Sequence, residues 1–495
     1  MKIAIIGGGA AGLMAAAAIH ENAPDAEVFL IERNDGLGKK VIISGGGRCN
    51  VTTGLRDVRE VLSKYPRGGK FLNSAMRRFP PEAVFAWFEA HGVPLKIEED
   101  LRVFPQSDDG HDVVGAFERL FEGSNVMIML NRHAIRIESA GDGYRIHFKD
   151  GSALEADRLI LTTGGQAFRH TGSTGDGYAF AESLGHKITP LAPSLNSFFT
   201  RETWSKDVSG LSFEKVRLRT KFAKTYEFTG PMLFTHRGVS GPAVFALSSL
   251  VAFEKYDAAY PMALKIDLFP DRTEQELFDK LENALREYPR RSLVNVLDFM
   301  LSKALAFALC SDVGLDAEAL AGGLPKKDIR KITEWLKGIP LAVIGRGAGD
   351  EFVTAGGIDL KDVDPRTMES KISPGLHFAG EILDIDGFTG GFNLQASWAT
   401  GRAAGEGPAA WPPSFHFDDE IDDAPAVGLD GRGLAGFPAN QRCAERGEVR
   451  DAAAAGRGFL RTDDVKNAAL AVDFDSHRRA DPGAAGPGRA VRDRH

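Results

Sequence analysis

The hydrophobic positions at the start of the chain form short runs separated by glycine. Residues 2–6 read KIAII and end at a glycine, as a buried parallel strand does. Residues 10–20 are small, apolar and helix-favouring, and residues 27–32 form a second apolar run. Strand, tight turn, helix and strand in this order predict a βαβ unit.

The pattern of hydrophobic and polar positions changes again in the later parts of the chain. Alternating stretches between residues 126 and 148 predict a strand or meander ahead of another buried strand at 158–162. Polar and apolar residues alternate over 200–268, which predicts β structure, and 274–336 has helical spacing. An apolar strand at 375–380 and a small-residue helix from about 393 to 404 follow.

These elements predict an α/β fold, in which a Rossmann-like FAD/NAD(P)-binding domain is interrupted by an inserted β-plus-helical domain. The predicted segments are a first part of the binding domain at 1–190, the insert at 191–345, a second part of the binding domain at 346–405, and a low-order tail at 406–495. The tail is rich in Ala, Gly, Asp, Arg and Pro with little periodicity, so we expect it to be largely disordered. Its composition also suits a readthrough or frame-shifted end.

The charge and the cysteine content indicate which partners and which cellular location to expect. The net charge of −8 gives no overall attraction for nucleic acid or an anionic membrane, so we expect neither as a partner. The three cysteines are far apart, which favours a reducing, cytoplasmic location over a disulfide framework. No metal-ligand spacing is found among the histidines, and oligomeric state is left open.

The first chemical motif is Gly7-x-Gly9-x-x-Gly12. It follows a strand, opens a helix, and precedes Glu32 at the end of the next strand, which is the context of a dinucleotide-binding turn. The helix N-terminus supplies N–H donors and partial positive charge for a pyrophosphate. Glu32 can accept hydrogen bonds from a ribose diol. Taken alone, the motif fits NAD and FAD equally.

The second motif is the glycine-dense segment 36–50, GLGKKVIISGGGRCN. Its consecutive glycines at 45–47 let the backbone approach a flat ligand closely, and Arg48 adds a charged donor fork. Composition alone also allows a flexible surface loop.

With four further blocks this segment resembles the BaiN-like (YhiN, aminoacetone-oxidase-like) FAD-dependent oxidoreductases. The other blocks are TGSTGDGY at 171–178, LFTHRGVSGPA at 233–243, TAGGI at 354–358 and GLHFAGEILDIDGFTGGFNLQ at 375–395. They cover about residues 1–405 in family order, and the tail has no counterpart.

The resemblance implies that FAD is bound by both ends of the chain around the insert. Its implied contacts are Gly7, Gly9, Ala11, Gly12, Glu32 and Arg33 for the ADP half; Lys40, Ser44, Gly46, Arg48 and Cys49 along the flavin side; Thr163 and Gly164 in a second turn; Gly380 and Glu381 at the ribityl chain; and Gly391, Phe392 and Asn393 at the flavin N1–C2=O edge. Reduction places negative charge at that edge, which a helix N-terminus stabilises.

Three residues are candidates for catalysis. Cys49 lies in the flavin-side loop, but no second cysteine is near it in sequence, so packing or flavin contact is favoured over a redox role. His236 and Arg237 lie in a glycine-bounded turn of the insert, where they can bind or protonate substrate. A structural turn, with His236 capping the helix near Gly241-Pro242, fits equally well.

No second strand–GxGxxG–helix unit is present for a nicotinamide cofactor. NAD(P)H, the reductant that the resemblance implies, is therefore expected to dock transiently at the insert or the flavin face. The favoured function is an enone-type reduction of a small molecule. The alternatives are a flavin-dependent amine oxidase that uses O₂, and an FAD-containing RNA-modification or binding factor without small-molecule turnover.

Overall fold

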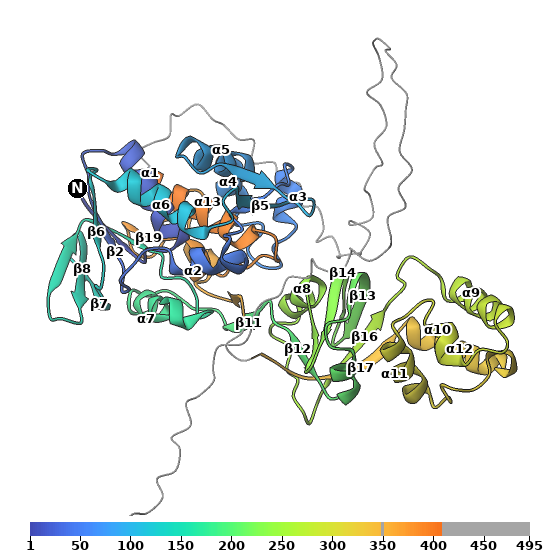
Figure 1. Ribbon diagram of the computed structural model, residues 1–495. Coiled ribbons are helices and arrows are strands. Elements are labelled where there is room, and N and C mark those ends of the chain that lie inside the picture. The colour runs from blue at the N-terminus through green and yellow to red at the C-terminus, as the bar shows by residue number, and fades with distance from the viewer. Residues whose placement is uncertain (348–350, 408–495) are drawn as a thin grey trace, which may run out of the picture. The chain divides into compact units, whose positions relative to one another are not determined.

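The computed structural model describes residues 1–347 and 351–407, so all but the first two residues of the predicted tail lie outside the described residues. A five-stranded sheet with the order β19-β10-β1-β2-β6 forms the centre of the first core (Figure 1). All its strand pairs are parallel. Its strands are β1 (Lys2–Ile6), β2 (Glu27–Ile31), β6 (Val126–Met129), β10 (Arg158–Leu161) and β19 (Leu376–Phe378).

The apolar runs of the sequence become this sheet because both of its faces are covered. Ala4, Ile5 and Leu30 are fully buried in it. The run that begins at Val126 pairs with β2 and completes one sheet edge, so only the two later stretches belong to the predicted meander. That meander is an antiparallel sheet of β7 (Ala134–Ala140), β8 (Gly143–Phe148) and β9 (Ala153–Ala156).

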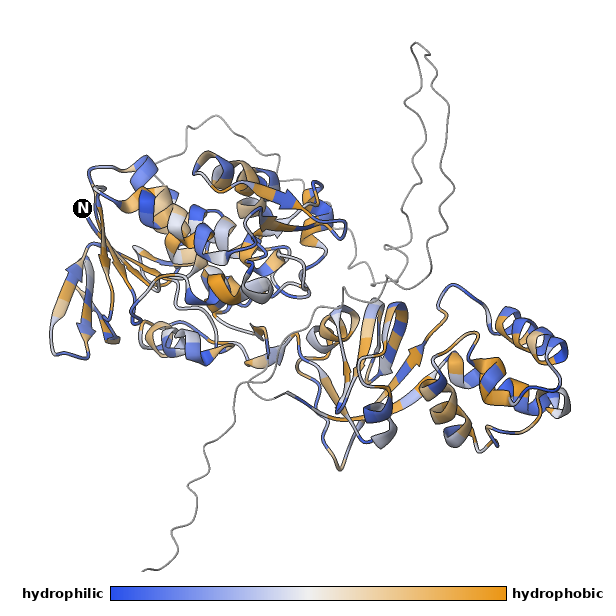
Figure 2. Ribbon diagram, viewed as in Figure 1, coloured by the Kyte–Doolittle hydropathy of each residue, from blue (hydrophilic) through white to orange (hydrophobic). Residues whose placement is uncertain are grey.

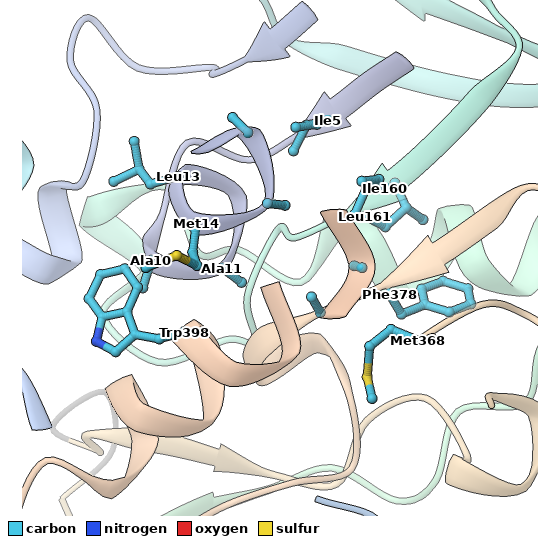
Figure 3. Packing of buried hydrophobic residues seen from close by; sticks show 14 of the residues in the cluster. Ile5, Ala10, Ala11, Leu13, Met14, Ile160, Leu161, Met368, Phe378 and Trp398 are labelled. Carbon is cyan, nitrogen blue, oxygen red and sulfur yellow. The ribbon is translucent and has the colours of Figure 1, made fainter. Parts of the chain in front are cut away.

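Helix α1 (Ala10–Asn22) packs against the last helix, α13 (Phe392–Glu406). Small residues allow the close approach: a Cβ on Gly401 would lie 2.3 Å from the Ala11 carbonyl oxygen. Trp398 of α13 is fully buried and belongs to the same hydrophobic core as Leu13 and Met14 of α1 (Figure 3). The two ends of the binding domain are therefore joined through one core.

Shorter elements surround this sheet. The helices are α2 (Lys39–Ile43), α3 (Val58–Leu62), α4 (Asn73–Arg78), α5 (Pro81–Ala90), α6 (Gly110–Phe121) and α7 (Asp176–Ser183). A small antiparallel sheet contains β3 (Thr52–Thr53), β4 (Leu95–Ile97) and β5 (Arg102–Pro105), and β11 (Ala192–Ser194) pairs with β18 (Val353–Ala355).

The inserted segment contains a closed six-stranded barrel and a group of helices, as the change from alternating to helical spacing predicts. Hydrophobic and hydrophilic residues alternate along its long strands (Figure 2). The barrel strands are β12 (Phe198–Thr200), β13 (Ser212–Lys221), β14 (Thr225–Thr235), β15 (Gly238–Ser240), β16 (Met262–Asp267) and β17 (Ile339–Arg346). The helices are α8 (Pro242–Leu250), α9 (Glu274–Glu287), α10 (Leu293–Leu297), α11 (Lys303–Val313) and α12 (Lys326–Leu336).

Two separate hydrophobic cores result. One draws on both ends of the described chain, and the other lies within residues 198–343. The α/β fold class and the presence of an insert are therefore confirmed, whereas the boundaries at 190 and 345 remain predictions. None of the described helices is long and apolar enough to cross a membrane.

Candidate functional site

The turn Gly7–Gly12 is held between the ends of β2 and β10. The Gly7 N–H donates to the Ile31 carbonyl at 2.8 Å, and the Thr162 hydroxyl donates to the Gly7 carbonyl at 2.8 Å. A Cβ on Gly12 would lie 1.9 Å from the Gly7 carbonyl oxygen. Only glycine fits there, because the helix starts directly against the strand end.

The N-terminus of α1 is suited to an anion. Its N-cap residue is Gly9, no side chain caps it, and its first turn contains no acidic residue. A Cβ on Gly9 would meet no atom within 4 Å, so the backbone is open to a ligand at this position. The partial positive charge of the helix end therefore faces a place where a phosphate can approach. Ala11, in the first turn, lies against Gly380 of the late block, whose Cβ would be 2.8 Å from that of Ala11.

Glu32 is 8% exposed at the end of β2, beside this turn. Its Oε2 accepts the Gly8 N–H at 2.8 Å, and its Oε1 accepts the Asn34 side-chain amide at 2.7 Å. Oε1 also accepts the Asn34 backbone N–H at 2.9 Å, so the remaining acceptor capacity for a ribose hydroxyl is on Oε2. The neighbouring Arg33 instead donates to the Asp176 carboxylate at 2.7 Å, which ties this strand end to the TGSTGDGY block.

Four distant segments meet at Glu381. The Lys40 ammonium donates to Glu381 Oε2 at 2.7 Å, and the Thr354 N–H donates to Glu381 Oε1 at 2.8 Å. The Thr354 hydroxyl in turn accepts the Gln166 N–H at 2.7 Å. The sequence predicts Lys40 and Glu381 as site residues, but their ion pair is seen only in the structure. Thr354 is missed as a site residue although its block is recognised.

The second predicted turn contains a buried hydroxyl that the described residues do not satisfy. Thr163 Oγ1 has no hydrogen-bond partner among the described residues, and neither has the buried hydroxyl of Tyr178. Burial, and then the charge of Glu381, raises the pKa of Tyr178. Gly164 follows in a left-handed conformation, with φ of 73°. Unpaired buried polar atoms beside a glycine turn are consistent with a ligand that supplies their partners.

The flavin-side loop begins where α2 ends. The Ser44 hydroxyl donates to the Val41 carbonyl at 2.8 Å, and Gly46 adopts φ of 74° with open space where a Cβ would be. The Arg48 guanidinium lies 3.7 Å from the centre of the Phe104 ring and is paired with Glu98 and Asp108. Arg48 is therefore engaged by carboxylates of its own domain.

Cys49 is fully buried, and its N–H donates to the Ser44 carbonyl at 2.9 Å. Burial raises the pKa of the Cys49 thiol to about 12, against a smaller opposing effect of its hydrogen bond with Ser44. It is therefore a protonated thiol near neutral pH, which favours packing over a thiolate reaction.

The N-terminus of α13 lies directly against this part of the chain. A Cβ on its N-cap residue, Gly391, would lie 2.2 Å from the Thr52 carbonyl oxygen, and no side chain caps the helix. The Asn393 side chain accepts the Gly387 N–H at 2.8 Å and so fixes the preceding turn. Tyr65, which the sequence analysis does not single out, donates its hydroxyl to the Phe392 carbonyl at 2.6 Å.

His236 and Arg237 are exposed in the turn between β14 and β15. The Arg237 guanidinium lies 3.7 Å from the centre of the Phe199 ring, and its carbonyl accepts the Thr200 N–H at 3.0 Å. These contacts are within the insert. Helix α8 begins at Gly241 without a side-chain cap, so His236 does not cap it. The structure does not join these two residues to the Lys40–Glu381 group.

Taken together, the residues fit an extended dinucleotide. An uncapped helix N-terminus with open space at Gly9 suits the phosphates, and a buried acid beside it suits a ribose. A second uncapped helix N-terminus, at Gly391, and the open Gly46 lie in the segments assigned to the flavin end. No cluster of metal-ligating side chains is present in residues 1–347 and 351–407.

Comparison with known proteins then decides the family. Residues 1–407 match the model of the HI0933-like protein Rossmann domain. The chain belongs to this family. The family resemblance drawn from the sequence blocks is thereby confirmed, and the protein is a flavoprotein oxidoreductase of the Rossmann type.

Two curated relatives are matched by this chain over nearly the whole of their own length. The 3-dehydro-bile acid delta(4,6)-reductase of Clostridium scindens is 30% identical over 419 residues, which covers 83% of this chain and 100% of the relative. The ribosomal RNA dihydrouridine synthase of Escherichia coli is 29% identical over 406 residues, covering 81% of this chain and 96% of the relative.

Among solved structures, a 3-ketosteroid-delta4-(5alpha)-dehydrogenase from Rhodococcus jostii is 15% identical, with a TM-score of 0.46, and the match covers 82% of this chain and 95% of that one. A flavocytochrome c3 fumarate reductase in an open conformation is 17% identical, with a TM-score of 0.44, over 82% and 77% of the two chains.

The expectation that nucleic acid is excluded as a partner is wrong. It rests on the net charge of −8, yet the Escherichia coli relative and a second relative, from Haemophilus influenzae, 28% identical over 404 residues, are both named ribosomal RNA dihydrouridine synthases. Net charge sums over the whole molecule, whereas RNA is attracted by the charges of the one face that it touches.

Proposed function

We propose that this protein is an FAD-dependent reductase that saturates a carbon–carbon double bond conjugated to a carbonyl group, with NADH or NADPH as the reductant. The names of the relatives support this reaction class. A 3-oxo steroid with unsaturation at positions 4 and 6 is a conjugated enone. The uracil ring has the same element, because its C5=C6 bond is conjugated to the C4 carbonyl. Dihydrouridine is the product of saturating that bond.

The observation that carries the proposal is the meeting of α13 with the glycine-rich loop. Gly391 lies so close to Thr52 that no side chain fits between them, and the Trp398 indole N–H donates to the Val51 carbonyl at 2.9 Å. The positive end of an uncapped helix is thereby held beside the segment that the resemblance assigns to the flavin. A site built to accept negative charge suits a cofactor that is reduced during turnover.

In this proposal the residues of the chain bind the cofactor and orient it. The Gly7–Gly12 turn holds the pyrophosphate, and Glu32 accepts a hydrogen bond from a ribose hydroxyl. The Lys40–Glu381 ion pair fixes the block at 375–395 against the segment at 36–50. When bound, FAD supplies the hydride that is added to the carbon–carbon double bond. Overall, the hydride comes from NAD(P)H and a proton completes the saturated bond.

Direct product analysis tests the proposal. The FAD-loaded protein is incubated without oxygen with NADPH or NADH and either a 3-oxo-4,6-diene steroid or uridine-containing RNA, and the products are analysed by mass spectrometry. We expect a gain of two hydrogens in the steroid or in the uracil base. A Gly391→Ala variant is assayed in parallel. It should give less product, because it disturbs the start of α13. A reduced product from neither substrate would refute the proposal.

A further inference from the structure

Strand β13 carries a row of cations on one face. Lys215, Arg217, Arg219 and Lys221 occupy alternate positions, whereas Val216, Leu218 and Thr220 between them are buried in the barrel. Alternate residues of a strand lie on the same side, about 7 Å apart. Lys265 of β16 is the cross-strand partner of Arg219 and is also exposed. We call these five residues the basic face.

The charges on this face are only partly balanced by neighbouring carboxylates. Lys215 is paired with Asp271 at 2.7 Å, and Glu227 is shared by Arg219 at 2.7 Å and Arg217 at 3.4 Å. Three of the five cations are therefore paired with two carboxylates, and among the described residues Lys221 and Lys265 make no ion pair. In addition, Arg219 and Lys265 are directly opposed across the sheet, an arrangement of like charges that destabilises a strand pair. Such a cost is expected where the charges serve binding.

The outward positions beside this row are small or polar. Thr225, Glu227 and Thr229 of β14 are paired with Lys221, Arg219 and Arg217, and Ala263 precedes Lys265 in β16. A membrane-binding surface needs large apolar side chains that enter the lipid, and these outward positions carry none. The face instead offers regularly spaced positive charges, which suit a polymer of regularly spaced negative charges.

The hairpin that bears this face also touches the candidate site. Phe228 of β14 lies 5.2 Å, between ring centres, from Phe388, which belongs to the turn just before α13. Phe228 is the cross-strand partner of the buried Leu218, so its side chain lies on the side of the sheet opposite the basic row, midway along that row. A polymer bound along β13 would therefore be anchored on the same hairpin that contacts the flavin-side turn.

We infer that the basic face of β13 binds the phosphate backbone of RNA and so presents a uridine to the flavin site. This inference rests on the proposed function and specifies its substrate class. Phosphate contacts of this kind position the nucleic acid without reading its sequence. They also make affinity fall with salt, because each neutralised phosphate releases counterions.

The test compares two triple variants of the full chain with equal charge change. In the first, Lys215→Gln, Arg219→Gln and Lys221→Gln remove charge from the basic face. In the matched control, Lys303→Gln, Lys327→Gln and Lys331→Gln remove three exposed cations from α11 and α12. Each set contains an ion-paired lysine, Lys215 with Asp271 and Lys331 with Asp328. Binding of fluorescein-labelled oligouridine is measured by anisotropy over a range of salt concentrations.

We expect the first variant to bind oligouridine at least about tenfold more weakly than the unmodified protein at low salt. The slope of the logarithm of its binding constant against the logarithm of the salt concentration should be shallower by about 2. The control variant should bind as the unmodified protein does. Equal affinity of the two variants, absence of RNA binding by the unmodified protein, or binding of anionic vesicles in place of RNA would overturn the inference.

Steroid reduction by the same proteins separates this inference from the proposed function. If the unmodified protein reduces the steroid but binds no RNA, the reductase proposal stands and the RNA face is wrong. If RNA binding depends on the basic face but neither steroid nor RNA is reduced, the face stands and the reductase proposal is wrong.

Discussion

The two ends of the candidate cofactor site are built in different ways. The phosphate end is one contiguous turn, Gly7–Gly12, between a strand and a helix that follow each other directly. The flavin end that we propose is assembled from Lys40, Thr163, Thr354 and Glu381, and from the start of α13 at Gly391. A local turn is specified by its own residues, whereas the flavin end exists only when distant segments pack correctly. The comparison predicts that substitutions act differently at the two ends.

The largest expected effect is at the phosphate end. Gly12→Val places a side chain where even a Cβ would lie 1.9 Å from the Gly7 carbonyl. We expect a loss of about 3 kcal/mol or more in the free energy of unfolding, and protein that retains no FAD. Thermal unfolding measures the loss of stability, and the flavin absorbance of the purified protein measures the FAD that it retains. Gly9→Ala is the control, since its Cβ meets nothing within 4 Å, and it should keep the native melting temperature. A stable, yellow Gly12→Val protein would contradict the turn geometry.

At the flavin end, Gly391→Ala combines a left-handed backbone, with φ of 88°, and a Cβ 2.2 Å from the Thr52 carbonyl oxygen. We expect it to lower the free energy of unfolding by about 2 kcal/mol and to slow flavin reduction. Gly123→Ala has the same kind of backbone, with φ of 68°, but open space around it. It should cost about 1 kcal/mol and leave flavin reduction unchanged. Identical behaviour of the two variants would mean that the contact with Thr52 is unimportant.

The ion pair between Lys40 and Glu381 should matter less. Its side chains are 29% and 16% exposed, so it is partly screened by solvent. A double-mutant cycle with Lys40→Met and Glu381→Gln should give a coupling energy of about 1 kcal/mol in thermal unfolding. A coupling near zero would show that the early and late segments are held together by packing alone.

The smallest effect is expected at Cys49. Cys49→Ser should change turnover by no more than about twofold, since the thiol is buried and protonated. A pKa raised from 9.0 to about 12 contributes stability that is complete below pH 9 and is lost as the pH rises towards 12. Iodoacetamide should therefore label Cys49 slowly at pH 8 until the protein unfolds, as peptide mapping would show. A large loss of turnover would make Cys49 a catalytic residue.

The sequence allows the local parts of this picture to be predicted. The strand–turn–helix pattern around Gly7 is confirmed, because glycine spacing and apolar runs act over neighbouring residues. The alternation in 200–268 is confirmed as β structure in β13 to β16, but the stretch that forms helix α8 is wrongly included. The closure of the barrel depends on pairing between β12 and β17, which no local pattern reports. The basic row on β13 is visible in the sequence as KVRLRTK, but its meaning depends on knowing which side of the strand is buried.

The flavin end could not be derived from spacing. Lys40 and Glu381 are separated by 341 positions, and only the family resemblance brings them into one site before the structure joins them. Tyr65 is missed because a single hydroxyl outside any motif gives no signal of its own. Thr354 is missed because the block at 354–358 does not show which of its residues makes a contact. Likewise, the pairing of Arg48 with Glu98 and Asp108 could not be predicted, because these two acids lie in a region with no recognisable motif. The position of Arg48 along the flavin stays a prediction.

The central claim, that the protein is a nicotinamide-linked flavin reductase, is tested most directly by anaerobic rapid mixing. The FAD-loaded protein is mixed with NADPH or NADH, and then with the 3-oxo-4,6-diene steroid or uridine-containing RNA, while the flavin absorbance is followed. The account predicts bleaching by one of the nicotinamides and recovery of the colour when one of the substrates is added. A flavin that neither nicotinamide bleaches, or that regains its colour only with oxygen, would contradict it.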